Sequence, residues 1–137
     1  MIDAVARYRA ASQRADIDAL LACLTPDAEL VSPISARLVF RGHDDLRVLL
    51  TGVYRALGEL QWTEERGDDA VRFAAGRAVL GPLTLTDITQ FDLSADGRIR
   101  CIRPHLRPWL ALTVLAGVLA ARLSRHPGVL RRALSTR

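Results

Sequence analysis

The sequence predicts an α+β fold in which N-terminal helices cover one face of a strongly curved, cone-shaped antiparallel sheet, with an extra apolar helix near the C-terminus. Apolar residues recur at helical spacing before residue 58, alternate with a period of two from about residue 60 to 105, and become nearly continuous from residue 109. We expect a cone domain over residues 1–108 and a helical extension over residues 109–137 that packs on the same domain.

Three helices and two short strands are expected in the first half of the chain. Val5 and Tyr8 mark the apolar stripe of a helix over residues 3–14. Asp16 caps a second short helix, which Thr25-Pro26-Asp27 ends. The remaining elements of this half are strands at 28–32 and 38–40 and a helix at 44–58, which Gly58 ends.

The second half of the chain alternates as the strands of antiparallel hairpins do. Strands are expected at 60–65, 71–75, 83–93 and 98–105, with turns at 66–69, 81–82 and 96–97. A helix then runs from residue 109 to about 125, where Pro127-Gly128 breaks the pattern before a short basic tail. A curved sheet covered by helices encloses a cone, and the mouth of that cone is the expected ligand site.

Positive charge is concentrated at one end of the chain. All 19 basic residues are Arg, which excludes lysine Schiff-base, pyridoxal-phosphate and P-loop chemistry. The 15 acidic residues all lie within residues 1–96, whereas residues 97–137 carry 9 Arg and no acid. Such an end suits an anionic membrane or an acidic partner surface. Nucleic acid is not expected, because no stacking aromatics are interleaved with the arginines.

The cysteines, histidines and N-terminus exclude further classes. Cys23 and Cys101 form no CxxC motif and read as reduced core residues, and the three His lack metal-ligand spacing. No metal or other cofactor is therefore expected. The N-terminus lacks the layout of a signal peptide, and the apolar run at 109–121 is too short to span a hydrocarbon core of about 30 Å. We expect a cytoplasmic protein.

Seven short motifs in a fixed order carry a family resemblance. They are Ala6-Arg7-Tyr8, Ala15-Asp16-Ile17, Thr25-Pro26-Asp27-Ala28-Glu29-Leu30, Ser32-Pro33, Phe40-Arg41-Gly42, Gln90-Phe91-Asp92 and Asp96-Gly97-Arg98-Ile99. Over residues 3–106 their order and spacing resemble the nuclear-transport-factor-2-like superfamily, and within it the SnoaL-like and ketosteroid-isomerase-like branch. The resemblance implies a cone-shaped α+β barrel, commonly dimeric, with an apolar pocket.

The resemblance also implies positions for catalytic groups. The tyrosine that donates to the substrate oxygen falls on Tyr8, the aspartate general base on Ser32, and the protonated acid of the oxyanion hole at or near Thr84. A serine hydroxyl is too weak a base to replace the carboxylate, so we do not expect steroid isomerisation by the family mechanism. Thr84 could still donate a hydrogen bond to an oxyanion, and Tyr8 could instead be a core tyrosine.

Two further residues could move a proton. Asp87 shares a strand face with Leu85 and Phe91, which would raise its pKa if that face is buried; the alternative is a cross-strand ion pair with Arg103. His105 ends the last expected strand and would lie near Asp87 in a simple hairpin register; the alternative is a rim histidine bonded to backbone.

These observations predict a protein that binds a small apolar molecule of polyketide-, terpenoid- or steroid-like shape. If it is an enzyme, it is a cofactor-free isomerase, cyclase or hydratase. The candidate catalytic residues are Tyr8, Asp87 and His105, and the candidate substrate-binding residues are Ser32, Trp62, Phe73 and Thr84. The alternative is a non-catalytic protein whose Arg-flanked C-terminal helix, apolar on all sides, forms a homodimer or touches a membrane surface.

Overall fold

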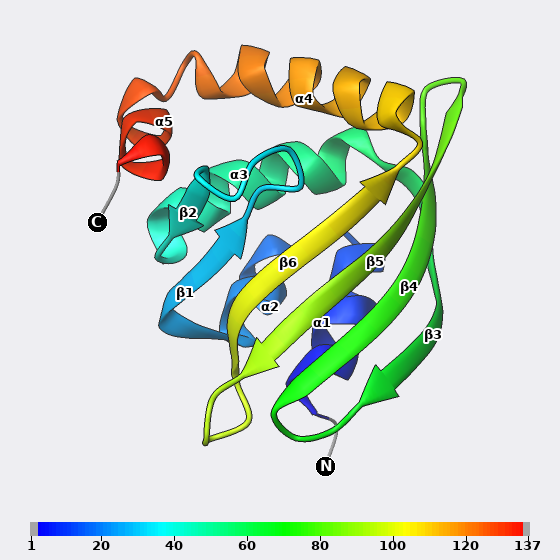
Figure 1. Cartoon of the computed structure of the whole chain (residues 1–137), viewed down its shortest axis with the longest axis vertical. Helices are drawn as coiled ribbons and strands as arrows, with labels where there is room; N and C mark the ends of the chain where they lie inside the picture. The colour runs from blue at the N-terminus through cyan, green and yellow to red at the C-terminus, as the bar shows by residue number, and fades with distance from the viewer. Residues whose placement is uncertain (1–2, 136–137) are drawn as a thin grey trace.

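The computed structural model describes residues 3–135 as a curved six-stranded sheet with helices against its concave face (Figure 1). The expected domain bounds at residues 1 and 137 lie outside the described residues. The predicted α+β fold is confirmed. In chain order the elements are α1 (Ala4–Gln13), α2 (Ile17–Ala22), β1 (Leu24–Val31), β2 (Val39–Arg41), α3 (His43–Ala56), β3 (Gly58–Gly67), β4 (Val71–Leu80), β5 (Leu83–Leu93), β6 (Ile99–Arg107), α4 (Trp109–Leu123) and α5 (Pro127–Leu134).

The strand order is β2-β1-β6-β5-β4-β3, and one pair departs from the expected antiparallel sheet. β1 and β6 pair in parallel, with Leu30 opposite Ile102. These strands are far apart in the chain, so no local turn sets their direction. β1 also begins at Leu24, four residues earlier than expected. It accommodates Pro26 because its register with β6 shifts between Leu24 and Glu29, where no ladder bond is required.

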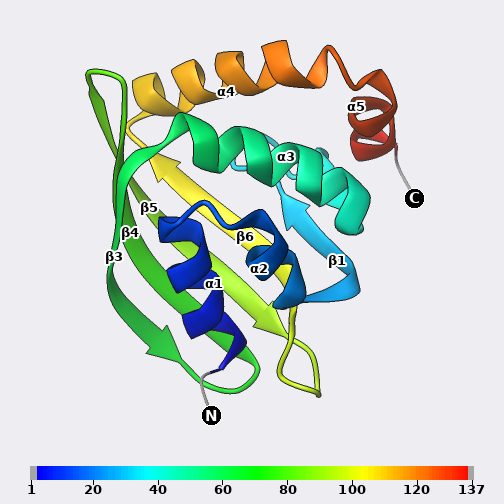
Figure 2. The same ribbon diagram turned by 180° about the vertical axis from the view of Figure 1, so that it is seen from behind.

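The first two helices begin at the aspartates that cap them. The Ala6 N–H donates to Asp3 Oδ1 at 2.8 Å, and the Ala19 N–H donates to Asp16 Oδ1 at 3.1 Å. The Asp16 cap predicted from the sequence is thus confirmed. Seen from behind in Figure 2, α1, α2 and α3 lie across the concave side of the sheet, while α4 lies across one end of the molecule.

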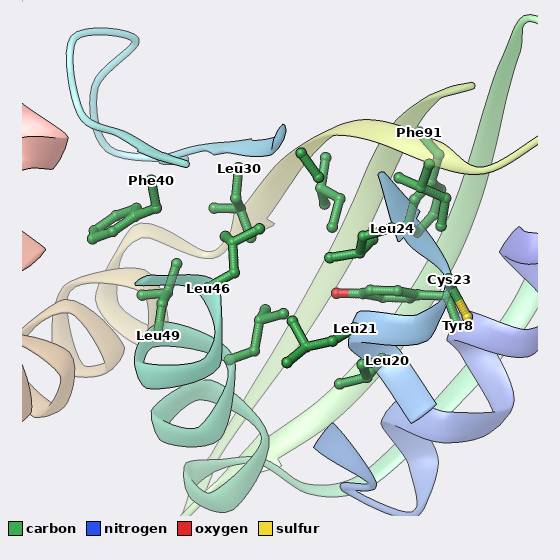
Figure 3. Packing of buried hydrophobic residues seen from close by; sticks show 14 of the residues in the cluster. Tyr8, Leu20, Leu21, Cys23, Leu24, Leu30, Phe40, Leu46, Leu49 and Phe91 are labelled. Atoms are coloured by element: carbon green, nitrogen blue, oxygen red, sulfur yellow. The ribbon is translucent and has the colours of Figure 1, made fainter. Parts of the chain in front are cut away.

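The core fills the space between the three N-terminal helices and the sheet. Tyr8 is fully buried among Leu20, Leu21 and Leu24, and its ring meets Phe91 edge-on with centroids 5.2 Å apart (Figure 3). The C-terminal helices join this same cluster through Leu123, Val129 and Ala133. α5 is further fixed by Arg132, whose guanidinium donates to both carboxylate oxygens of Asp45 on α3.

Candidate active site

An apolar cavity of about 410 Å³ lies between the sheet, α3 and α4. Its size falls within the range of about 300–1,000 Å³ that is usual for small-molecule sites. α3 contributes Leu49, Leu50 and Val53 to the wall, and α4 contributes Leu112, Leu115 and Leu119. The predicted apolar C-terminal helix therefore forms one wall of the cavity.

Two tyrosine hydroxyls meet at the wall of this cavity. Tyr8 Oη and Tyr54 Oη lie 2.8 Å apart, one from α1 and one from α3. Burial is the main cause that raises the pKa of both phenols, and the nearby Asp87 carboxylate raises each further. Both groups therefore stay protonated at neutral pH. The hydrogen bond between the two oxygens uses only one of the two hydroxyl protons. The other hydroxyl proton can therefore be donated to a ligand oxygen.

Asp87 is the carboxyl group in the wall of the cavity. The Thr89 hydroxyl donates to Asp87 Oδ2, and the backbone N–H of His105 donates to Asp87 Oδ1 at 3.1 Å. Burial raises the pKa of Asp87 from 3.8 to about 6, although both hydrogen bonds oppose the shift. At pH 7 the group is thus about nine-tenths ionised, with the basicity that suits a general base near neutrality.

The ion pair between Asp87 and Arg103 that the sequence left as an alternative does not form. Arg103 lies opposite Gln90 in the β5–β6 register, so its side chain is on the other face of the sheet from Asp87. Its guanidinium instead pairs with Asp92, with Arg103 Nη2 and Asp92 Oδ2 3.2 Å apart. The raised pKa of Asp87 is therefore not offset by a salt bridge, in keeping with the other interpretation drawn from the sequence.

Four of the residues predicted from the sequence line the cavity: Tyr8, Ser32, Trp62 and Asp87. The Ser32 hydroxyl accepts the Ile34 N–H at 3.1 Å, so its oxygen serves the loop that follows β1. The Trp62 indole N–H donates to Ser12 Oγ at 2.9 Å, which leaves its ring as an apolar wall.

The expectation that Phe73, Thr84 and His105 face the cavity is wrong. Successive residues of a strand point to opposite faces, and each of these three is exposed beside a residue that faces inward. Ala74 and Leu85 are buried where Phe73 and Thr84 are not.

His105 lies opposite Ile88, whereas its neighbour Leu106 lies opposite Asp87 and lines the cavity. His105 Nδ1 lies 3.1 Å from the Ile88 carbonyl oxygen, which is the rim arrangement that the sequence left as the alternative.

Four polar residues that line the cavity were not among the candidates: Tyr54, Arg77, Thr89 and Ser124. Thr89 and Tyr54 both line the cavity, and each is hydrogen-bonded to a candidate residue, Asp87 and Tyr8 respectively. The signals were present, because Thr89 follows Asp87 at strand spacing and Tyr54 lies on the inward stripe of its helix. Residues 3–135 hold no cluster of three or more His, Cys, Asp or Glu side chains that could bind a metal ion.

A curved sheet whose concave face is covered by helices, with an apolar cavity between the sheet and the helices, is typical of the nuclear-transport-factor-2-like class of cone folds. The SnoaL-like domain matches residues 5–102, and the chain belongs to that family. No curated protein matches the chain significantly. Within the described residues, no helix is long and apolar enough to cross a membrane.

Several solved structures share the fold. A protein with a cystatin-like fold from Silicibacter pomeroyi has a TM-score of 0.86 at 20% identity, over 95% of this chain and 93% of the other. A steroid delta-isomerase from Pseudomonas aeruginosa has a TM-score of 0.80 at 21% identity, over 91% and 92%. A SnoaL-like protein of unknown function from Burkholderia thailandensis has a TM-score of 0.64 at 17% identity, over 74% and 90%.

Proposed function

We propose that this SnoaL-like protein binds a small apolar molecule bearing a carbonyl or similar oxygen and moves a proton on it without a cofactor, as an isomerase, cyclase or hydratase. The observation that carries the proposal is the Asp87 carboxyl, set in an apolar cavity wall with its pKa raised to about 6. A polyketide-, terpenoid- or steroid-like ligand suits the apolar wall, with Trp62 as a flat surface for rings and Ser32 at its edge.

The proposed step is an allylic proton transfer. The Asp87 carboxylate takes a proton from the carbon next to the substrate carbonyl; the electron pair of that C–H bond moves onto the oxygen as an enolate. The free hydroxyl proton of the Tyr8–Tyr54 pair donates to that oxygen and stabilises the charge as it forms. Protonated Asp87 then returns the proton to the far carbon of the conjugated system, and the enzyme is restored. The steroid delta-isomerase that shares the fold supports this reaction class.

The test is a panel of β,γ-unsaturated ketones, enones and epoxides presented to the parent protein and to three variants. Asp87→Asn should lower kcat by about 10²-fold or more, since a positioned base contributes about 10²–10⁴-fold. Tyr54→Phe should lower kcat less, because Tyr8 can still donate. Thr84→Ala changes an exposed residue of the same strand on the opposite face and should leave the rate unchanged.

The pH dependence of kcat shows whether Asp87 acts as a general base or only helps to bind the substrate. The parent kcat should rise as the pH passes about 6, where Asp87 ionises, and Asp87→Asn should abolish that rise. No turnover of any panel member by the parent protein would contradict the enzymatic part of the proposal. Ligand binding would then be judged by whether an apolar fluorescent probe is displaced by the same compounds.

A further inference from the structure

Helix α4 is apolar on the face that it presents to solvent. Its inner face contributes the buried Ala111 and Leu115 to the core. Its outer face carries Trp109, Leu110, Val114 and Val118, which are 74%, 49%, 39% and 44% exposed. A helix that borders water normally shows charged or polar side chains there, but residues 109–121 hold no charged residue.

The polar atoms of this surface are turned back into the helix. The Thr113 hydroxyl donates to the Trp109 carbonyl at 2.7 Å, so its proton is already used within the helix. Leu110, Val114 and Val118 are spaced four residues apart and form one stripe along the helix. Figures 1 and 2 show α4 as the outermost element at its end of the molecule, with no described segment over its outer side.

Positive charge lies at both ends of the stripe. Arg107 precedes α4 and Arg125 follows it; both are exposed, and neither has an ion-pair partner among residues 3–135. The whole segment 97–137 has no acidic residue to balance them. If two copies packed α4 against α4, either orientation would bring arginines against arginines, which disfavours a second copy as the occupant. Anionic lipid headgroups would neutralise the same charges.

We propose that α4 docks in the surface of an anionic lipid bilayer, with Trp109 and the Leu110–Val114–Val118 stripe at the acyl boundary and Arg107 and Arg125 among the headgroups. A helix that lies in the plane of the interface enters about 5–10 Å and does not span the bilayer. Because Leu112, Leu115 and Leu119 on the other side of α4 line the cavity, docking places the cavity next to the membrane. The proposal does not depend on the proposed reaction.

The test is vesicle flotation of the full chain. The parent protein should float with vesicles of equal parts phosphatidylcholine and phosphatidylglycerol, more weakly with phosphatidylcholine alone, and less as salt is added. Trp109 emission should shift to shorter wavelength on binding, since Trp62 is part-buried and its indole N–H is already bonded within the protein. Replacing Arg107 or Arg125 with Gln should weaken binding about fivefold each.

Matched variants distinguish binding through this surface of α4 from nonspecific adsorption of the protein to vesicles. Val114→Glu and Val118→Glu should abolish flotation, while Ile88→Glu, at a residue that is 54% exposed on β5, should float like the parent. Circular dichroism and thermal unfolding of each variant check that it is folded. Flotation of Val114→Glu at the parent level, or failure of the folded parent to float with anionic vesicles, would overturn the proposal. So would a dimer that Val114→Glu dissociates, because the face would then belong to a second copy.

Discussion

Replacing Asp87 with Asn should stabilise the protein at neutral and alkaline pH. Burial raises the pKa of this carboxyl from 3.8 to about 6, so the native state binds the proton more tightly than the unfolded chain does. The resulting contribution to stability is fully present below about pH 3.8 and is lost as the pH rises through about 6. Asn carries no charge at any pH and avoids that loss.

The size of the effect follows from the two pKa values. The interval between 3.8 and about 6 corresponds to about 3 kcal/mol of unfolding free energy at pH 8, as an upper bound. Asn is neutral like the protonated carboxyl, and the pKa of about 6 already includes the hydrogen bonds from Thr89 and His105, which both lower it. The gain at pH 8 is therefore at most about 3 kcal/mol, or roughly 9 °C in Tm. At pH 4 the gain should vanish.

Guanidinium unfolding followed by circular dichroism at pH 4 and pH 8 measures the difference directly. All other titrating groups are common to both proteins, so the change between the two pH values isolates Asp87. Asp96→Asn is the control of opposite sign, because hydrogen bonds from Ser94 and Arg98 lower the Asp96 pKa to about 2. That variant should be less stable than the parent at pH 8. If Asp87→Asn were destabilised equally at both pH values, burial would not disfavour the ionised carboxyl in the native state, and the raised pKa of Asp87 would be refuted.

Three further predictions concern the cavity and its walls. Tyr8→Phe should cost about 1 kcal/mol in chemical unfolding, and adding Tyr54→Phe should cost much less than a second such loss, because the two hydroxyls share one hydrogen bond. Ala116→Phe extends a ring from α4 into the cavity and should block an apolar fluorescent probe without unfolding the protein; unchanged probe affinity would place the site elsewhere. Gly52→Ala puts a Cβ 2.6 Å from Arg122 Cδ and should push α4 from α3, seen as faster amide exchange in α4; unchanged exchange would show that Arg122 simply moves.

Hydrophobic periodicity predicted the order and type of the elements from α1 to α4, whereas α5 was expected only as a short basic tail. The apolar stripes of helices α1 and α3 and the alternation along strand β5 are local patterns, which can be recognised without knowing how the rest of the chain folds. The parallel pairing of β1 with β6 could not be read in this way. It depends on where the chain returns after one helix and four strands (β2, α3, β3, β4 and β5) have packed, and no local turn encodes it.

The candidate site was predicted in part, and strand parity explains the errors. A displacement of one residue moves a side chain to the other face of a sheet. Asp87 was placed by the alternation along its own strand, which reaches the correct face. Thr84 was assigned to the site by the family resemblance and His105 by an assumed hairpin register. Each is next in sequence to a residue whose side chain faces the cavity or core, so its own side chain lies on the opposite face of the sheet. Tyr54 and Thr89 shared the correct periodicity, but only the packed structure brings their oxygens to Tyr8 and Asp87.

Helix α4 shields the Asp87 carboxyl from water. Leu115 of α4 packs with Leu85 and Leu106, the residues that flank Asp87 along β5 and across from it on β6. These contacts exclude water from the carboxyl and so hold up its pKa; moving α4 away would solvate the charge and lower the pKa toward 3.8. We expect that the apolar ligand proposed above would remove more water from the cavity and raise the pKa of Asp87 further, which would make the carboxylate a stronger base in the ligand-bound protein than in the empty one.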